Sequence, residues 1–158
     1  MQIREARIED AADACHTLRR SIAELCGLDH GGDPDVLERR LANKTPKTLA
    51  AWIANPANRV LVTEEDGAIL AVGAVTAAGE ITLNYVSPDA RFRGVSSALL
   101  RRLERGARAL GNTACSLTSS QTAHRFYLAR GYVDAGEIPG KFGTARSFVM
   151  TKQLAHED

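Results

Sequence analysis

The sequence predicts one α/β domain across residues 1–158, built on a mixed, mostly antiparallel sheet of about seven strands. Apolar segments of helical and of strand spacing alternate along the chain, and no repeat, low-complexity tract or linker divides it. Three strand-like runs joined by short turns, one of them Glu65-Asp66-Gly67, predict an antiparallel meander. The length suits a single domain with a sizeable core.

The first third of the chain is expected to form a strand followed by three helices. The strand is predicted over 2–8. Apolar residues at helical spacing predict a helix over 11–25, with Asp10 as its N-cap. A short helix is expected over 35–43, and Thr45 should cap a further helix that begins with proline.

The rest of the chain alternates strands with two helices. The long helix, 95–110, has an apolar stripe and outward arginines, and the strand after it should run parallel to the strand before it. A second helix is expected over 121–130, capped by Ser120. The strands of this part are predicted at 59–63, 68–77, 80–86, 113–118, 132–136 and 145–154.

The composition is that of an ordinary globular protein. Hydrophobic residues make up 44% and charged residues 25%, and the net charge of +1 gives no bulk attraction to nucleic acid. The three cysteines, Cys15, Cys26 and Cys115, fit neither zinc nor redox spacing and are expected to be reduced and buried. Reduced thiols, no signal-peptide pattern and no long apolar run predict a cytoplasmic protein without membrane association.

The stretch 86–100 carries the clearest functional signal. A strand ends at Pro88, and two arginines and a glycine lead into the long helix. The first turn of a helix has N–H groups without intrahelical partners, and its dipole favours an anion. Gly94 lets the backbone approach a ligand, and Arg91 and Arg93 can bond phosphate oxygens. This turn therefore predicts a site for a phosphate-bearing ligand.

Two motifs occur in a fixed order, one in this turn and one downstream. The segment Arg91-Phe92-Arg93-Gly94-Val95-Ser96 is similar to the acyl-CoA motif Arg/Gln-x-x-Gly-x-Gly/Ala of the GNAT N-acetyltransferases. The segment 123–132, which contains Phe126-Tyr127, resembles that family's second motif, Asn-x-x-Ala-x-x-Phe-Tyr-x-x-x-Gly-Phe/Tyr. Ser96 departs from the small residue that ends the first motif, and Ser120 from the asparagine that begins the second.

The resemblance implies acetyl-CoA as acyl donor, helices on both faces of the sheet, and a central strand pair that splays to admit the coenzyme. No metal is expected. A splayed strand leaves backbone groups unpaired, and a peptide-like pantetheine arm can satisfy them. The residues expected to contact the coenzyme are Tyr85, Val86, Arg91, Phe92, Arg93, Gly94, Val95, Ser96, Ser97, Ser120 and Tyr127.

Attack of an amine on a thioester needs a base for the amine and an acid for the leaving thiolate. The resemblance implies Tyr127 as the acid, against the alternative of a core aromatic in a Phe-Tyr pair. Glu80 is the candidate base by resemblance to histone-type members, although a solvated turn residue explains it equally well and a water relay can replace it. Asn84 shares a strand face with Glu80 by alternation and could orient water or substrate.

The acceptor is expected to be a primary amine of a small molecule or peptide. The loop with Asp29 and His30 should form part of its pocket, since acidity suits a cationic amine; metal binding there is the weaker alternative, because the loop lacks further ligands. Two other functions stay open: a non-catalytic CoA-binding sensor or interaction module, and a generic phosphate-binding α/β domain. A homodimer is also left open.

Overall fold

The computed structural model describes residues 1–27, 31–138 and 147–155. Within them, seven strands form one sheet in the order β1-β2-β3-β4-β5-β7-β6, and only the pair β4–β5 is parallel. The predicted seven-stranded mixed sheet is therefore confirmed. The strands are β1 (Gln2–Glu5), β2 (Asn58–Glu65), β3 (Ala68–Thr76), β4 (Glu80–Val86), β5 (Ala114–Ser119), β6 (Val133–Ile138) and β7 (Ser147–Gln153).

The helices agree with the predicted segments, with small shifts at their ends, except that the helix predicted over 121–130 spans only His124–Ala129 and has Ala123 rather than Ser120 as its N-cap. They are α1 (Ala11–Leu25), α3 (Pro34–Leu41), α4 (Pro46–Ala54), α5 (Val95–Ala109) and α6 (His124–Ala129), with short 3-10 turns η1 (Ile8–Asp10) and η2 (Pro88–Ala90). Thr45 caps α4 by accepting a hydrogen bond from the Thr48 amide. Asp10, in contrast, does not cap α1, because its carboxylate is bound to Arg4 and to the Arg7 amide. Residues 145 and 146 of the last predicted strand lie outside the described ranges.

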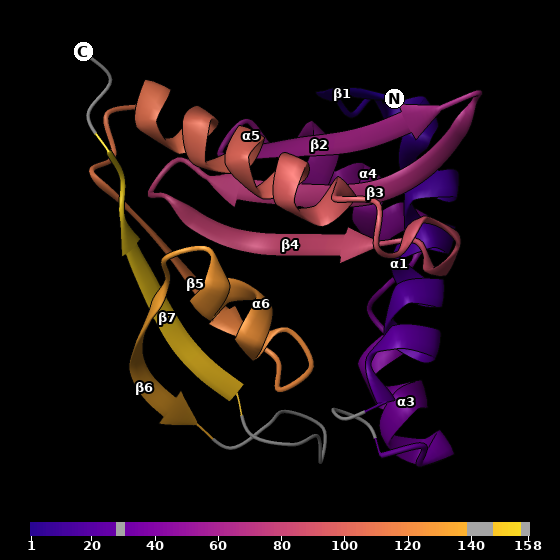
Figure 1. Ribbon diagram of the computed structural model, residues 1–158. Coiled ribbons are helices and arrows are strands. Elements are labelled where there is room, and N and C mark those ends of the chain that lie inside the picture. The colour runs from indigo at the N-terminus through magenta and orange to yellow at the C-terminus, as the bar shows by residue number, and fades with distance from the viewer. Residues whose placement is uncertain (28–30, 139–146, 156–158) are drawn as a thin grey trace.

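Helices cover both faces of the β1–β4 half of the sheet. In Figure 1, α5 lies in front of β2, β3 and β4, and α1 and α4 lie on the opposite face. Two apolar clusters fill these interfaces, one built around α5 and the other around α1. Gly73 lets α5 pack closely on β3, because a Cβ there would meet Leu103 Cδ1 at 2.9 Å.

Strands β4 and β5 diverge from one end. Their register pairs only Glu80 with Ser116 and Ile81 with Leu117, at the start of β4. Beyond this point the two strands separate, with β5, β6 and β7 swung away from β4 in Figure 1. The predicted splay of the central strand pair is thus confirmed, and among the described strands the rest of β4 pairs only with β3.

Two expectations about composition can be compared with the fold. Cys15, Cys26 and Cys115 are buried and free of disulfides, as predicted. Among the helices in the described ranges, none is long and apolar enough to cross a bilayer.

Candidate active site

A cavity of about 680 Å³ opens where β4 and β5 separate. Its walls come from β4, the end of β5, the start of α5 and the inner side of α6, and from α1 and α3 at the other end. A cleft of this size can hold a cofactor-sized ligand. Segments that are far apart in the sequence therefore meet at the position that the splay creates.

The first turn of α5 forms one end of this cavity. Gly94 is its N-cap, has φ of 74°, and provides no side chain to bond the first amides of the helix. Val95, Ser96 and Ser97 all line the cavity. The amides of an uncapped helix start, together with the helix dipole, attract an anion such as a pyrophosphate.

The two arginines before Gly94 differ in their surroundings. Arg91 lines the cavity, and its guanidinium lies 4.6 Å from the ring centroid of Phe92, which is almost fully exposed and has a positive φ of 63°. Arg93 instead donates to both carboxylate oxygens of Glu65, at 2.9 and 2.8 Å, and lowers the pKa of that carboxyl. The Arg93 side chain does not line the cavity, contrary to expectation.

Tyr127 faces the cavity from α6 and is buried, with only 7% of its surface exposed. Asn84 Nδ2 donates a hydrogen bond to Tyr127 Oη across 3.3 Å. Burial raises the pKa of the Tyr127 phenol to about 12, although the hydrogen bond from Asn84 opposes this shift. The phenol therefore stays protonated at neutral pH, and from α6 its oxygen meets Asn84 of β4 in the cavity.

A β-bulge in β4 orients the Asn84 side chain toward Tyr127. Ala74 pairs with Leu83 while the next residue of β3, Val75, pairs with Ile81, so Thr82 is an extra residue on β4. Ile81 accordingly packs in the α5 cluster and Leu83 in the α1 cluster, although they are two residues apart.

The bulge corrects the expectation that Asn84 and Glu80 share a strand face. Alternation reverses at Thr82, so Asn84 turns toward α6 and Glu80 toward the opposite face. Glu80 is exposed and is absent from the cavity lining. Glu80 lies four positions before Asn84 on the strand, a distance of about 13 Å between their Cα atoms.

The described wall of the cavity is cationic. It includes Arg40, Lys44, Arg91 and Arg130, and among the described residues it contains no Asp, Glu or His. The acidic wall expected from Asp29 and His30 concerns residues outside the described ranges. Over the described part of the chain, no group of three or more His, Cys, Asp or Glu side chains could hold a metal ion.

Most coenzyme candidates from the sequence meet at this cavity. Ser120 lines it and caps the turn before α6, since its Oγ accepts from the Ala123 amide at 3.2 Å. The candidates that line the cavity are Tyr85, Val86, Arg91, Phe92, Gly94, Val95, Ser96, Ser97, Ser120 and Tyr127, together with the substrate candidate Asn84.

Sequence reasoning did not identify Arg40 or Arg130, which also line the cavity. Arg130 follows Tyr127 by three residues, and this spacing places two side chains on one face of a helical turn. This spacing from Tyr127 could have identified Arg130 from the sequence. Arg40 donates to Tyr85 Oη across 3.4 Å between α3 and β4, a contact without a local sequence signal.

A parallel strand pair thus splays beside a helix N-terminus and a buried phenol. Residues 34–154 match the family described as the acetyltransferase (GNAT) domain. The chain therefore belongs to the GNAT acetyltransferase family, which confirms the resemblance seen in its motifs.

Individual relatives agree with this family. The amino-acid acetyltransferase of Azotobacter vinelandii is 30% identical over 85% of this chain and 28% of its own length, and that of Pseudomonas aeruginosa is 29% identical over 97% and 33%. The chain thus spans about a third of the length of these curated relatives.

Solved structures show the same fold. A GCN5-related N-acetyltransferase from Rhodopseudomonas palustris has a TM-score of 0.85 and 25% identity, covering 97% of this chain and 95% of its own. The PaiA N-acetyltransferase of Thermoplasma acidophilum, solved in complex with coenzyme A, has a TM-score of 0.83 and 17% identity, covering 97% and 98%.

Proposed function

We propose that this chain transfers the acetyl group of acetyl-CoA to a primary amine by direct attack. The observation that carries the proposal is the buried Tyr127 phenol, which lines the cavity and stays protonated at neutral pH because burial raises its pKa. In the reaction the amine nitrogen bonds to the thioester carbonyl carbon, and the C–S bond breaks. The leaving thiolate takes the Tyr127 proton, and the proton released by the amine passes to water.

Water, rather than Glu80, is proposed to accept the proton of the amine. The described lining offers no carboxylate or imidazole, and Glu80 lies on the opposite strand face. The cationic lining supports this route, because positive charge nearby lowers the pKa of an ammonium group and raises the fraction of neutral amine.

The acceptor is proposed to be a small amine that also carries a carboxylate, such as an amino acid. Arg40 and Lys44 lie in the wall away from the α5 turn, and cationic side chains suit a carboxylate. The relatives named amino-acid acetyltransferases point to the same class. The buried free thiols support a reducing compartment such as the cytoplasm.

The test is release of free thiol from acetyl-CoA with a panel of amino acids, their amides, polyamines, aminoglycosides and peptides. Turnover with sequential kinetics and no acylated cysteine is expected, with amino acids preferred over their amides. Binding of CoA without turnover on any amine would instead indicate a CoA-binding sensor. Binding of free phosphate but not of CoA would indicate a generic anion site.

A further inference from the structure

A second, smaller cavity of about 330 Å³ adjoins the start of α5. It shares Ser97 and Arg130 with the main cavity and extends along α5 to Arg101 and Glu104, with Lys152 of β7 on its other side. A ligand bound at the α5 N-terminus therefore has a neighbouring space one helical turn away, at a distance of about 5 Å along the axis.

Positively charged residues outnumber negatively charged residues in the described lining of this second cavity. Glu104 is its only acidic lining residue in the described part of the chain, and it accepts hydrogen bonds from Tyr132 Oη at 2.9 Å and Lys152 Nζ at 3.1 Å. Among the described residues, no carboxylate pairs with the guanidinium of Arg101 or Arg130. The guanidinium groups of Arg101 and Arg130 are thus available to bind an anion.

The Arg130 guanidinium is held in one orientation. Its Nε donates to Ser97 Oγ at 2.8 Å, its Nη1 donates to the Phe126 carbonyl at 3.2 Å, and it stacks 4.0 Å from the Phe126 ring centroid. Within the described chain, Nη2 has no acceptor. An arginine fixed in this way needs little further ordering to bind a ligand.

We propose that Arg130 binds the 3′-phosphate of coenzyme A, a role that rests on the proposed use of acetyl-CoA. In CoA the 3′-phosphate is separated from the pyrophosphate by one ribose. The pyrophosphate would lie on the amides of Val95 to Ser97, and Arg130 is bonded to Ser97 of this same turn, so its guanidinium is within reach of an anion one sugar away. Arg101 lines the same small cavity. Arg130 therefore selects the phosphorylated coenzyme over its dephospho form.

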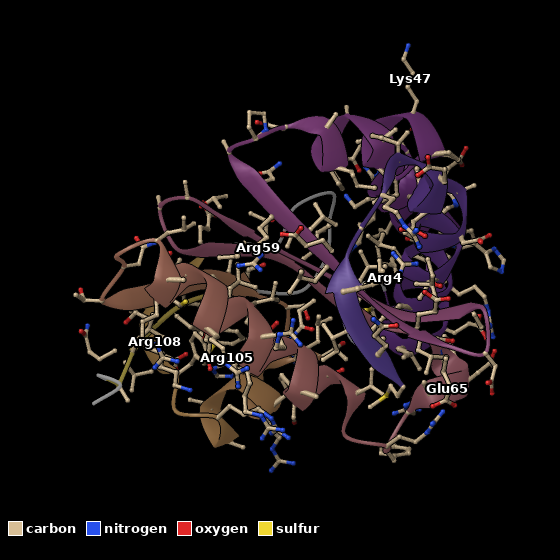
Figure 2. The ribbon with its side chains drawn as sticks, turned by 90° about the horizontal axis from the view of Figure 1, so that it is seen from above. Arg4, Lys47, Arg59, Glu65, Arg105 and Arg108 are labelled. Atoms are coloured by element: carbon tan, nitrogen blue, oxygen red, sulfur yellow. The ribbon has the colours of Figure 1, made fainter. Side chains whose placement is uncertain are left out.

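The test is calorimetric titration of the full chain with CoA and with 3′-dephospho-CoA. The wild type is expected to bind CoA at least tenfold more tightly. Arg130→Gln should weaken CoA binding about tenfold and leave dephospho-CoA binding within twofold. Arg105→Gln removes the same charge from the exposed side of α5 (Figure 2), outside both cavities, and should change neither affinity.

The proposal is overturned if Arg130→Gln weakens the binding of both ligands equally, or weakens the binding of neither. The wild-type comparison does not depend on the folding of the variant: equal binding of CoA and dephospho-CoA by the wild type also overturns it, while leaving the proposed acetyl transfer intact. Failure of the proposed function has a different signature, since the wild type would then bind neither ligand or would bind CoA without turnover.

Discussion

Asn84 Nδ2 and Tyr127 Oη lie 3.3 Å apart and join β4 to α6 across the gap between the separated strands. The other amide atom of this side chain, Asn84 Oδ1, is buried and has no hydrogen-bond partner in the described chain. A buried acceptor of this kind costs free energy unless a ligand satisfies it. Asn84 therefore donates a hydrogen bond to the proposed acid through Nδ2, and its Oδ1 is available to accept a hydrogen bond from an N–H group of a substrate.

Asn84→Asp tests this relationship with almost no change of shape. A carboxylate beside Tyr127 would accept the phenol proton in a hydrogen bond and raise its pKa further, so proton donation to the thiolate would weaken. We expect kcat to fall about tenfold or more, with a much smaller change in the KM for acetyl-CoA. Asn55→Asp is the control, since Asn55 Oδ1 only accepts from the Ala57 amide and aspartate can do the same.

Tyr127→Phe should remove the proposed acid and keep the ring. We expect kcat to fall about 100-fold with CoA affinity unchanged, as measured by steady-state kinetics and calorimetry. Tyr132→Phe is the matched control, because Tyr132 lies outside the cavity and donates to buried Glu104. It should lower the free energy of unfolding by about 1 kcal/mol and leave kcat unchanged. Full activity of Tyr127→Phe would contradict the assignment.

The pH profile follows from the same phenol. A group whose pKa is raised to about 12 stays protonated through the range of the assay, so Tyr127 gives no loss of activity on the alkaline side. The rate should rise with pH as the acceptor amine loses its proton, and should then level off. A decline of kcat in wild type below about pH 10 that is absent in Tyr127→Phe would contradict a pKa near 12.

Glu80→Gln distinguishes water from a protein base. Because Glu80 is exposed and lies on the face of β4 opposite Asn84, kcat/KM should change by less than about threefold over pH 6 to 9. Thiol release with saturating acetyl-CoA measures this directly. A loss of about 100-fold that is restored at high pH would mean that the Glu80 carboxylate does deprotonate the amine.

The sequence predicted the sheet, the order of its elements and the α5 turn, because local apolar periodicity and glycine placement determine these features. It did not predict the bulge at Thr82, since nothing in the alternating residues of β4 signals an extra residue whose effect depends on pairing with β3. The same limit applies to Arg93, whose partner Glu65 lies 28 residues away on β2. Sequence reasoning therefore missed the side-chain contacts that depend on how distant segments of the chain pack together.

Gly94→Ala tests the coenzyme turn through its backbone. Gly94 has φ of 74°, and a Cβ there would meet no atom within 4 Å, so the effect of alanine is conformational strain rather than a clash. We expect the free energy of unfolding to fall by about 1 kcal/mol and CoA binding to weaken severalfold. Gly27→Ala, at a position without positive φ and also without neighbours, should do neither. Equal effects of the two substitutions would contradict a role for the left-handed turn.

Arg4 of β1, labelled in Figure 2, should contribute to the pH dependence of stability. Its guanidinium bonds both carboxylate oxygens of Asp10, at 2.7 and 3.0 Å, and these bonds are the main cause that lowers the pKa of Asp10 from 3.8. A carboxyl with a lowered folded-state pKa adds stability above its unfolded pKa, and this contribution is lost as the pH falls through the folded pKa.

Arg4→Met should therefore lower the unfolding free energy at pH 7, and the difference from wild type should shrink as the pH falls below about 4. Urea unfolding at a series of pH values measures both quantities. Lys47→Met removes one positive charge from an exposed position on α4 that has no carboxylate partner among the described residues, and it should show no such pH dependence. A difference for Arg4→Met that stays constant from pH 7 to pH 2 would mean that Arg4 stabilises the fold by packing alone, because protonation of Asp10 would then have no effect on their contact.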